Sequence, residues 1–189
     1  MAKRYLKQEL FNKREIDMKI AVLLATGTEE IEVITPIDVL RRAGVTVDIV
    51  SVSGGETVCS HNVQIVPDKL IEQVSLSEYD GVVIPGGMPG AVNIANNQEA
   101  VNGIKDLLMK GKLVSAICAS PAVVLAENGM LNVKRATCYP LEQFVCALGD
   151  KYTATDVEVC DNVITANGPK SALKFALSIC EYLGVTAKF

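Results

Sequence analysis

Short apolar runs alternate with stretches of helical spacing along most of the chain, and this alternation restricts the folds open to it. The run from Lys19 to Ala25 is almost continuously apolar, as expected for a strand buried on both faces of a sheet. Apolar residues recur at helical spacing from Ile31 to Ala43, and Gly44 follows as a helix C-cap signal. Val45 to Val52 is the next apolar run, so the three segments predict a βαβ unit with parallel strands.

The rest of the chain continues this pattern of buried strands and helices. A small hairpin, or short strands on either side of residues 60–62, is expected between residues 57 and 66. Further strands are expected over Tyr79–Pro85, Leu113–Ile117, Val157–Cys160 and Val163–Ala166. Further helices are expected over Gln98–Lys110, Pro121–Asn128, Leu141–Leu148 and Ser171–Leu183. The order of elements predicts an α/β fold, a sandwich with a mostly parallel central sheet.

Length, composition and charge narrow the class of protein. A chain of 189 residues with 49% hydrophobic residues predicts one domain with a sizeable core, over residues 18–189. Residues 1–17 are polar and charged, and we expect them to be an N-terminal tail or extension peripheral to function. The net charge of −4 gives no reason to expect binding to nucleic acid or to an anionic membrane. Without a bilayer-spanning run or a signal-peptide pattern, we expect a cytoplasmic protein.

The cysteines, the histidine and the glycines exclude several kinds of site. The six cysteines form no C-x-x-C pair, so we expect no metal, and most of them are expected to be buried, reduced thiols. His61 is the only histidine, so a triad within one chain must use it or do without an imidazole. The first strand is not followed by G-x-G-x-x-G, which argues against a dinucleotide, and we expect no cofactor.

Cys118 lies where a buried strand ends and small residues begin. Pro121 follows at the first turn of the next helix, where its fixed φ and its missing N–H are tolerated. A cysteine in this turn would lie near the unpaired N–H groups of the helix, which favour the thiolate over the thiol. The sequence therefore predicts a reactive thiolate at Cys118.

Two other loops are expected beside Cys118, since sites in such sheets lie beyond the carboxyl ends of the strands. Glu32 follows the first strand between Ile31 and Val33, and a carboxyl in apolar surroundings tends to keep its proton. Adjacent glycines allow backbone N–H groups to approach a reacting oxygen, so we expect an oxyanion site built from three amides, those of Gly86, Gly87 and Ala119. Glu29 and Glu30 are interpreted more simply, as acidic residues that complement the dipole of a helix.

These motifs together resemble the DJ-1 (ThiJ/PfpI) family, in its Parkinson-disease-protein-like branch and within the class I glutamine amidotransferase-like superfamily. The resemblance runs from about Lys19 to the C-terminus. It is carried by Glu29–Glu32 before Pro36–Gly44, and by Tyr79–Gly87, Ala116–Pro121, Ala136–Pro140 and Asn167–Pro169.

The resemblance implies a flavodoxin-like, three-layer sandwich that forms homodimers. It also implies that Cys118 is the reactive cysteine, carried on a nucleophile elbow. Glu32 matches the protonated glutamate that hydrogen-bonds this thiol, and the amides named above match the backbone donors around it.

Several activities are credited to members of this family. Some are glutathione-independent glyoxalases or protein deglycases, so the implied substrate is a small reactive carbonyl or a glycated protein. Others are oxidative-stress sensors or redox-regulated chaperones that use the same cysteine, and a few are proteases or carry a thiamine-biosynthesis label. We expect a glyoxalase or deglycase type of enzyme with a cysteine nucleophile, and keep the sensor or chaperone as the alternative.

Two residues depart from the family pattern. Tyr139 stands where human-type members carry a histidine, so this loop supplies no imidazole base for Cys118, which argues against protease chemistry. Its hydroxyl would still be able to hydrogen-bond a substrate. His61 stands where relatives carry an arginine near the dimer contact. Either a partner chain brings it close to the opposite cysteine and its substrate, or it is a solvated loop residue.

Overall fold

The computed structural model describes residues 18–189, and the tail predicted for residues 1–17 lies outside the described residues. The strands are β1 (Lys19–Leu24), β2 (Thr46–Ser51), β3 (Thr57–Val58), β4 (Gln64–Ile65), β5 (Lys69–Leu70), β6 (Gly81–Ile84), β7 (Leu113–Ile117), β8 (Val157–Cys160) and β9 (Val163–Ala166). The α-helices are α2 (Glu30–Arg42), α3 (Gly90–Asn96), α4 (Gln98–Met109), α5 (Glu142–Leu148) and α6 (Ala172–Tyr182).

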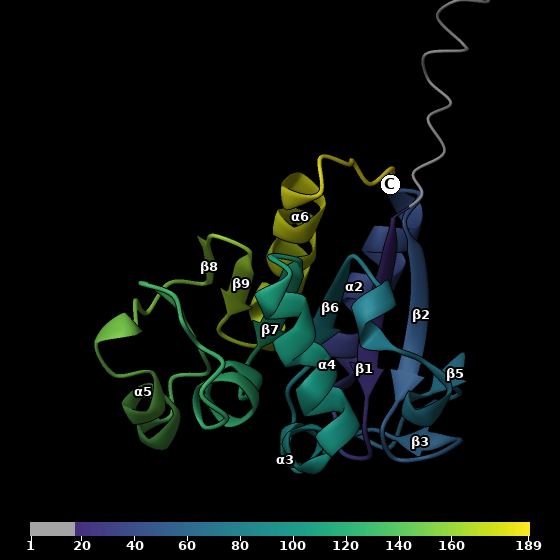
Figure 1. Ribbon diagram of the computed structural model, residues 1–189, viewed down its shortest axis with the longest axis horizontal. Coiled ribbons are helices and arrows are strands. Elements are labelled where there is room, and N and C mark those ends of the chain that lie inside the picture. The colour runs from purple at the N-terminus through teal and green to yellow at the C-terminus, as the bar shows by residue number, and fades with distance from the viewer. Residues whose placement is uncertain (1–17) are drawn as a thin grey trace, which may run out of the picture.

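A seven-stranded sheet in the order β5-β2-β1-β6-β7-β9-β8 forms the centre of the molecule (Figure 1). Neighbouring strands are parallel except for β8 and β9, which are antiparallel and form a hairpin. Strands β3 and β4 pair separately as a small antiparallel hairpin. The predicted α/β fold with a mostly parallel sheet is confirmed.

Both faces of the sheet are buried, which explains why its strands are almost continuously apolar. Along β1, Ile20 and Val22 pack on the face that α2 and α6 cover. Ala21 and Leu23 alternate with them and join the core formed with α3, α4 and α5 on the other face. The period-two alternation of a strand therefore places alternate residues of β1 in two separate cores, one on each face of the sheet.

The structure differs from the sequence-based expectation in three elements. The helix predicted over Pro121–Asn128 is a π-helix over Pro121–Ala126. Helix α3 and strand β5 were not predicted. Strand β5 has two residues, too few for a period to be recognised. Helix α3 starts at a glycine and has seven residues, so its local preference for helix is weak.

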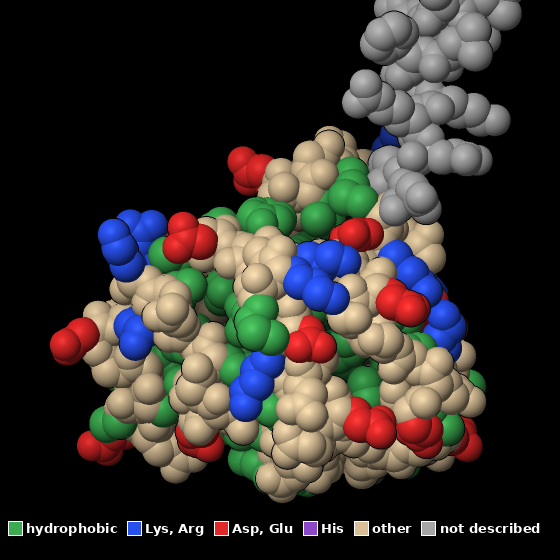
Figure 2. All heavy atoms as spheres, viewed as in Figure 1, with side chains coloured by type: hydrophobic (Ala, Val, Ile, Leu, Met, Phe, Trp, Pro, Cys, Tyr) green, Lys and Arg blue, Asp and Glu red, His purple; other side chains and the backbone are tan. Residues whose placement is uncertain are grey.

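Charged side chains of both signs are interspersed on the face of the molecule drawn in Figure 2. Lysine and arginine side chains alternate there with aspartate and glutamate side chains, with no broad patch of one sign. In the described part of the chain, no helix combines the length and the apolar character needed to cross a membrane.

Candidate active site

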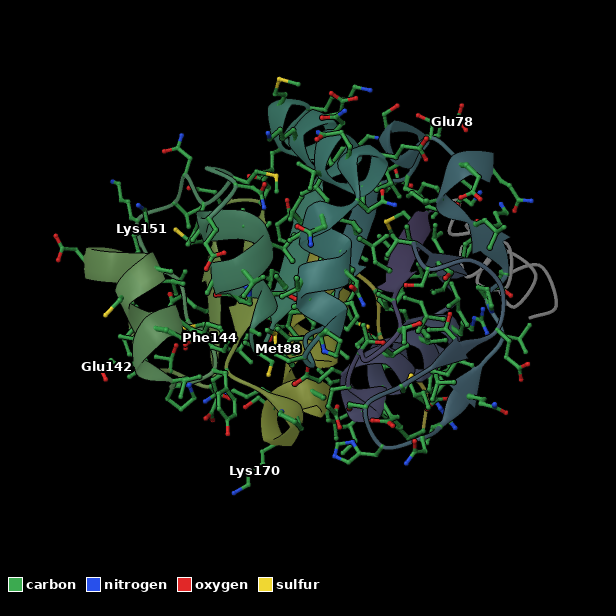
Figure 3. The ribbon with its side chains drawn as sticks, turned by 90° about the horizontal axis from the view of Figure 1, so that it is seen from below. Glu78, Met88, Glu142, Phe144, Lys151 and Lys170 are labelled. Carbon is green, nitrogen blue, oxygen red and sulfur yellow. The ribbon has the colours of Figure 1, made fainter. Side chains whose placement is uncertain are left out.

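Three loops converge because β1, β6 and β7 are neighbours in the sheet. Residues Ile20–Val22 of β1 pair with Gly81–Val83 of β6, and Gly81–Ile84 of β6 pair with Leu113–Ala116 of β7. The three strands thus end at the same edge, toward which the arrows point in Figure 1. Figure 3 views the molecule from that side. The loops after these strands carry the start of α2, the glycine pair Gly86-Gly87, and Cys118.

Cys118 occupies a sharp turn between β7 and the π-helix. Its φ of 65° lies in the left-handed region, which is uncommon for a residue other than glycine. Backbone hydrogen bonds restrain the turn on both sides: the Cys118 N–H donates to the Ala166 carbonyl at 2.9 Å, and the Tyr139 N–H donates to the Cys118 carbonyl at 2.8 Å. This strained strand-to-helix turn is the geometry of a nucleophile elbow.

Glu32 lies in the first turns of α2, and its side chain has no exposed surface. One carboxyl oxygen, Oε2, accepts a hydrogen bond from the Gly86 N–H at 2.8 Å. The other, Oε1, is buried without a hydrogen-bond partner among residues 18–189. Burial raises the pKa of Glu32 to about 7, and the charge of Glu29 raises it further, while hydrogen bonds from Gly86 and Cys118 oppose the rise. A carboxyl of this kind exchanges a proton near neutral pH.

Gly86 keeps the carboxyl and the cysteine close together. A Cβ atom at this position would lie 2.6 Å from the Cys118 Cβ and 2.8 Å from the Glu32 Oε2, so any larger residue would force the two apart. Gly87 has a φ of 82°, and a Cβ there would lie 2.4 Å from the Glu29 nitrogen. Both glycines are required by close packing, in addition to any role of their amides.

The three backbone amides predicted as an oxyanion site divide between two tasks. The Gly86 N–H is occupied by Glu32, so its assignment as an oxyanion donor was wrong: it positions the carboxyl. The N–H groups of Gly87 and Ala119 instead interact with the Cys118 sulfur and favour its charged form. These two donors remain beside the atom at which a reaction would begin.

The protonation of Cys118 differs from the expectation. Burial raises the pKa of the thiol to about 12, and the charge of the Glu32 carboxylate adds to this rise, which exceeds the opposing effect of the Gly87 and Ala119 amides. A helix N-terminus contributes about 0.3–1 kcal/mol, less than one pKa unit, and the helix here is a π-helix of six residues. Burial and the Glu32 charge thus favour the thiol over the thiolate that the helix end predicts, and a proton-exchanging carboxyl lies beside it.

A pocket of about 240 Å³ opens above Cys118. It is lined by Gly87, Met88, Cys118, Ala119, Tyr139, Leu141, Gln143 and Phe144. Tyr139 thus lies where the sequence placed a substrate contact, with its side chain half exposed. None of the lining residues carries a charge, so the pocket suits an uncharged ligand.

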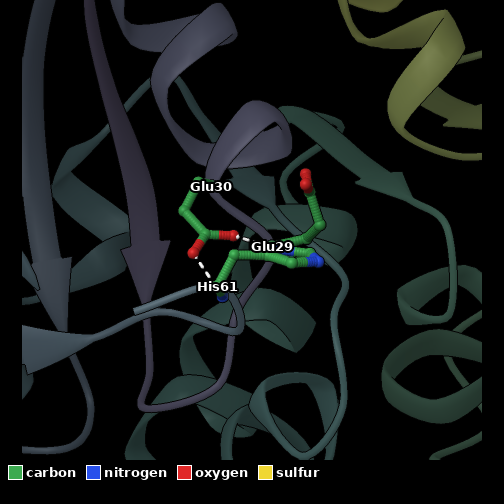
Figure 4. A group of neighbouring side chains, drawn as sticks. All are labelled: Glu29, Glu30 and His61. Carbon is green, nitrogen blue, oxygen red and sulfur yellow. Dashed lines mark hydrogen bonds and ion pairs between the residues drawn. The ribbon is translucent and has the colours of Figure 1, made fainter. Parts of the chain in front are cut away.

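His61 is not among the residues that line this pocket, and it contacts Glu30 instead (Figure 4). Its ring Nδ1 is 2.8 Å from the Glu30 Oε2, its backbone N–H donates to the Glu30 Oε1, and the Ser60 hydroxyl donates to Oε2 at 3.0 Å. Burial alone would raise the pKa of Glu30, but these hydrogen bonds outweigh it and lower the pKa to about 2. Glu30 therefore anchors the loop between β3 and β4, a role beyond the dipole complement predicted for it.

Glu29 behaves as predicted at the start of α2, where its Oε2 accepts the Glu32 N–H at 2.9 Å. Glu29, Glu30 and His61 bring potential metal-ligand atoms within 4.8 Å of one another. Hydrogen bonds to both oxygens of Glu30 account for this arrangement.

Sequence reasoning missed the apolar residues of the pocket wall. The sequence pattern indicates only a loop at Met88 and only a helix at Leu141 and Phe144, although all three residues line the space above Cys118. Met88 follows the glycine pair directly, and this adjacency was the available signal. Leu141 and Phe144 come from a segment more than twenty residues beyond Cys118, and only the folded chain brings them to the site.

Comparison with known proteins gives a consistent result. The DJ-1/PfpI family matches residues 18–182. Protein dj-1beta of Drosophila melanogaster is 40% identical over 164 residues, 86% of this chain and 87% of that protein. The glutathione-independent glyoxalase DJR-1.2 of Caenorhabditis elegans is 38% identical over 165 residues, which cover 87% of each protein. Among solved structures, that of oxidized Toxoplasma gondii DJ-1 has a TM-score of 0.84 and 40% identity, and the match covers 88% of this chain and 90% of that one.

Proposed function

The chain belongs to the DJ-1/PfpI family, and from this premise we propose that it is a glutathione-independent glyoxalase. Its substrate would be a small 2-oxoaldehyde, which it converts to the corresponding 2-hydroxy acid. The observation that carries the proposal is the buried pair of Glu32 and Cys118, in which a carboxyl with a pKa near 7 contacts the thiol. The printed name of the Caenorhabditis elegans relative supports the same activity.

The first step is addition of the thiol to the aldehyde. The Cys118 sulfur forms a bond to the aldehyde carbon while Glu32, as carboxylate, accepts the thiol proton. The electron pair of the carbonyl double bond moves to its oxygen, which the Gly87 and Ala119 amides stabilise. Return of the proton from Glu32 to this oxygen gives a neutral hemithioacetal and regenerates the carboxylate.

The second step is an internal transfer of two electrons from the former aldehyde carbon to the ketone. Glu32 removes the proton from the carbon that bears sulfur, and the electron pair forms the double bond of an enediol. Glu32 gives this proton to the ketone oxygen, then takes the proton of the hydroxyl on the sulfur-bearing carbon and delivers it to the neighbouring carbon, which gives the thioester of a 2-hydroxy acid. Water then cleaves the carbon–sulfur bond of the thioester, releases the acid and restores the thiol, so the net reaction consumes one water and needs no external oxidant.

Lactate formation from methylglyoxal tests this function. The folded wild-type protein should form lactate without added glutathione, whereas Cys118→Ala should be inactive. Glu32→Gln should keep the fold but lose at least a hundredfold in kcat, the usual range for a general acid–base. Absence of lactate with correctly folded wild-type protein would exclude the proposal.

The alternative function, an oxidative-stress sensor or redox-regulated chaperone, would use Cys118 as an oxidisable thiol. Oxidation proceeds through the thiolate, and the raised pKa of Cys118 opposes its formation. The solved structure of oxidized Toxoplasma gondii DJ-1 supports this alternative. A glycated protein as substrate is disfavoured by the small volume of the pocket. The homodimer and the cytoplasmic location stay predictions; sedimentation analysis of the full chain tests the first.

A further inference from the structure

The outer wall of the Cys118 pocket is apolar and partly exposed. Met88 and Leu141 have 50% and 45% of their surface exposed. Met88 comes from the loop after β6, while Leu141 and Phe144 come from the start of α5. Figure 3 shows Met88 and Phe144 near one another at this edge of the molecule. Exposed apolar side chains gathered around a pocket indicate that it receives an apolar group.

Leu141 is an unusual residue for its position. It is the N-cap of α5, with φ −98° and ψ 134°, and its side chain makes no capping hydrogen bond. Serine, threonine, aspartate and asparagine are preferred at an N-cap because their side chains accept a backbone N–H of the first turn, and leucine is among the poorest choices. An exposed leucine here lowers the stability of the helix, and such local conflicts concentrate at functional sites.

We propose that Leu141, together with Met88 and Phe144, binds the substituent of the 2-oxoaldehyde, and that the site prefers a branched alkyl substituent to the methyl group of methylglyoxal. This inference rests on the proposed function and specifies its substrate class. The pocket volume of about 240 Å³, at about 30 Å³ for each water-sized group, has room for a substituent larger than methyl. The branched compound 4-methyl-2-oxopentanal carries such a substituent.

The reaction at the aldehyde and ketone is unchanged, because the branched chain lies beyond the two reacting carbons. With the Cys118 sulfur on the aldehyde carbon, a substituent directed toward α5 would contact Leu141. A polar or charged substituent would lose its hydration in this pocket without gaining a hydrogen bond from the apolar wall. The site therefore discriminates by the apolar surface of the substituent.

The ratio of kcat/KM for 4-methyl-2-oxopentanal to kcat/KM for methylglyoxal measures this preference. In the wild type the ratio should be about ten or more, which is the discrimination in kcat/KM that one or two additional methylene groups usually give when they are buried in an apolar pocket. Leu141→Ser should lower the ratio about tenfold. The same change should raise Tm by about 2–4 °C, since serine caps the helix. Loss of selectivity would then accompany a gain in stability, so unfolding would not explain it.

Leu141→Met is the matched control, because methionine keeps an apolar wall and adds no cap. It should leave both the ratio and Tm close to the wild-type values. A wild-type ratio of one or less, or an unchanged ratio in Leu141→Ser, would overturn the inference. An unchanged ratio is also the result expected if Leu141 only contacts another chain.

Failure of the proposed function would look different: neither aldehyde would be turned over by the folded wild type. In that case, the selectivity of binding is measured by how well each aldehyde protects Cys118 from labelling by iodoacetamide. Either aldehyde can protect the thiol because it forms a reversible hemithioacetal with it. Half-protection at an about tenfold lower concentration of 4-methyl-2-oxopentanal supports the apolar subsite. Equal concentrations for the two aldehydes refute it.

Discussion

Glu32→Gln should remove a pH dependence of stability that the buried carboxyl imposes on the fold. The pKa of Glu32 is raised from 4.5 to about 7 by burial, so the folded chain holds this proton more tightly than the unfolded chain. Below pH 4.5 both states are protonated and the stability contribution is fully present. It is lost as the pH rises through about 7, because the unfolded chain has already released its proton and the folded chain must ionise a buried group.

The size of this effect follows from the two pKa values. At about 1.4 kcal/mol per pKa unit, the complete loss is about 3 kcal/mol. Most of this loss, about 2–3 kcal/mol, falls between pH 5 and pH 8. Glutamine keeps the size of the side chain and cannot ionise, so the free energy of unfolding of Glu32→Gln should lack this component.

Urea unfolding of the two proteins at pH 5 and at pH 8, under reducing conditions and at equal ionic strength, measures the effect. The free energy of unfolding of the wild type relative to Glu32→Gln should fall by about 2–3 kcal/mol between the two pH values. Glu181→Gln, on the exposed side of α6, controls for the loss of a surface carboxylate. A difference between wild type and Glu32→Gln that is equal at both pH values would show that the carboxyl ionises as freely in the fold as in water.

Three further measurements test other contacts of the site and of the loop that Glu30 anchors. Glu32→Gln should lower the pKa of the Cys118 thiol, because a neighbouring negative charge is removed, and iodoacetamide should label Cys118 faster at pH 8; an unchanged labelling rate by mass spectrometry would contradict the coupling. Gly86→Ala should lower the free energy of unfolding by about 1–3 kcal/mol through overpacking, whereas Gly55→Ala, with nothing within 4 Å of its Cβ, should change it little in the same urea assay. Glu30→Gln should lower Tm at pH 7, and the decrease should become smaller as the pH falls from 4.5 toward 2. The stability that the Glu30 carboxylate contributes is lost in that range, because its depressed pKa keeps it ionised in the fold down to about pH 2. A Tm difference independent of pH would refute the anchoring role.

The fold could be predicted from sequence because its strands are buried on both faces. Continuous apolar runs such as that of β1 leave little choice of environment, and strands β8 and β9 have the bounds that were predicted. The rule that sites lie beyond the carboxyl ends of parallel strands then placed the loops of Glu32, Gly86 and Cys118 together. These inferences need only the spacing of apolar residues, the order of the strands and helices along the chain, and the polarity of the loops.

The electrostatics of the site could not be predicted in the same way. The helix end after Cys118 is visible in the sequence, but its influence is smaller than those of burial and of the Glu32 charge, both of which depend on tertiary packing. The partner of the Gly86 N–H was likewise hidden, since an amide can face a substrate or a carboxyl with the same sequence around it. The wall formed by Leu141 depends on where α5 packs, and its poor capping chemistry becomes informative only once the helix boundary is known.

The raised pKa of Cys118 bears directly on which chemistry the site performs. Burial and the Glu32 charge raise the pKa of the thiol, so its reaction with peroxide or with an alkylating agent requires prior loss of the thiol proton. Addition to an aldehyde is less affected, because Glu32 can accept the thiol proton while the carbon–sulfur bond forms, and no free thiolate has to accumulate. The carboxyl that suppresses unassisted reactions of the thiol is thus the base that assists the carbonyl reaction.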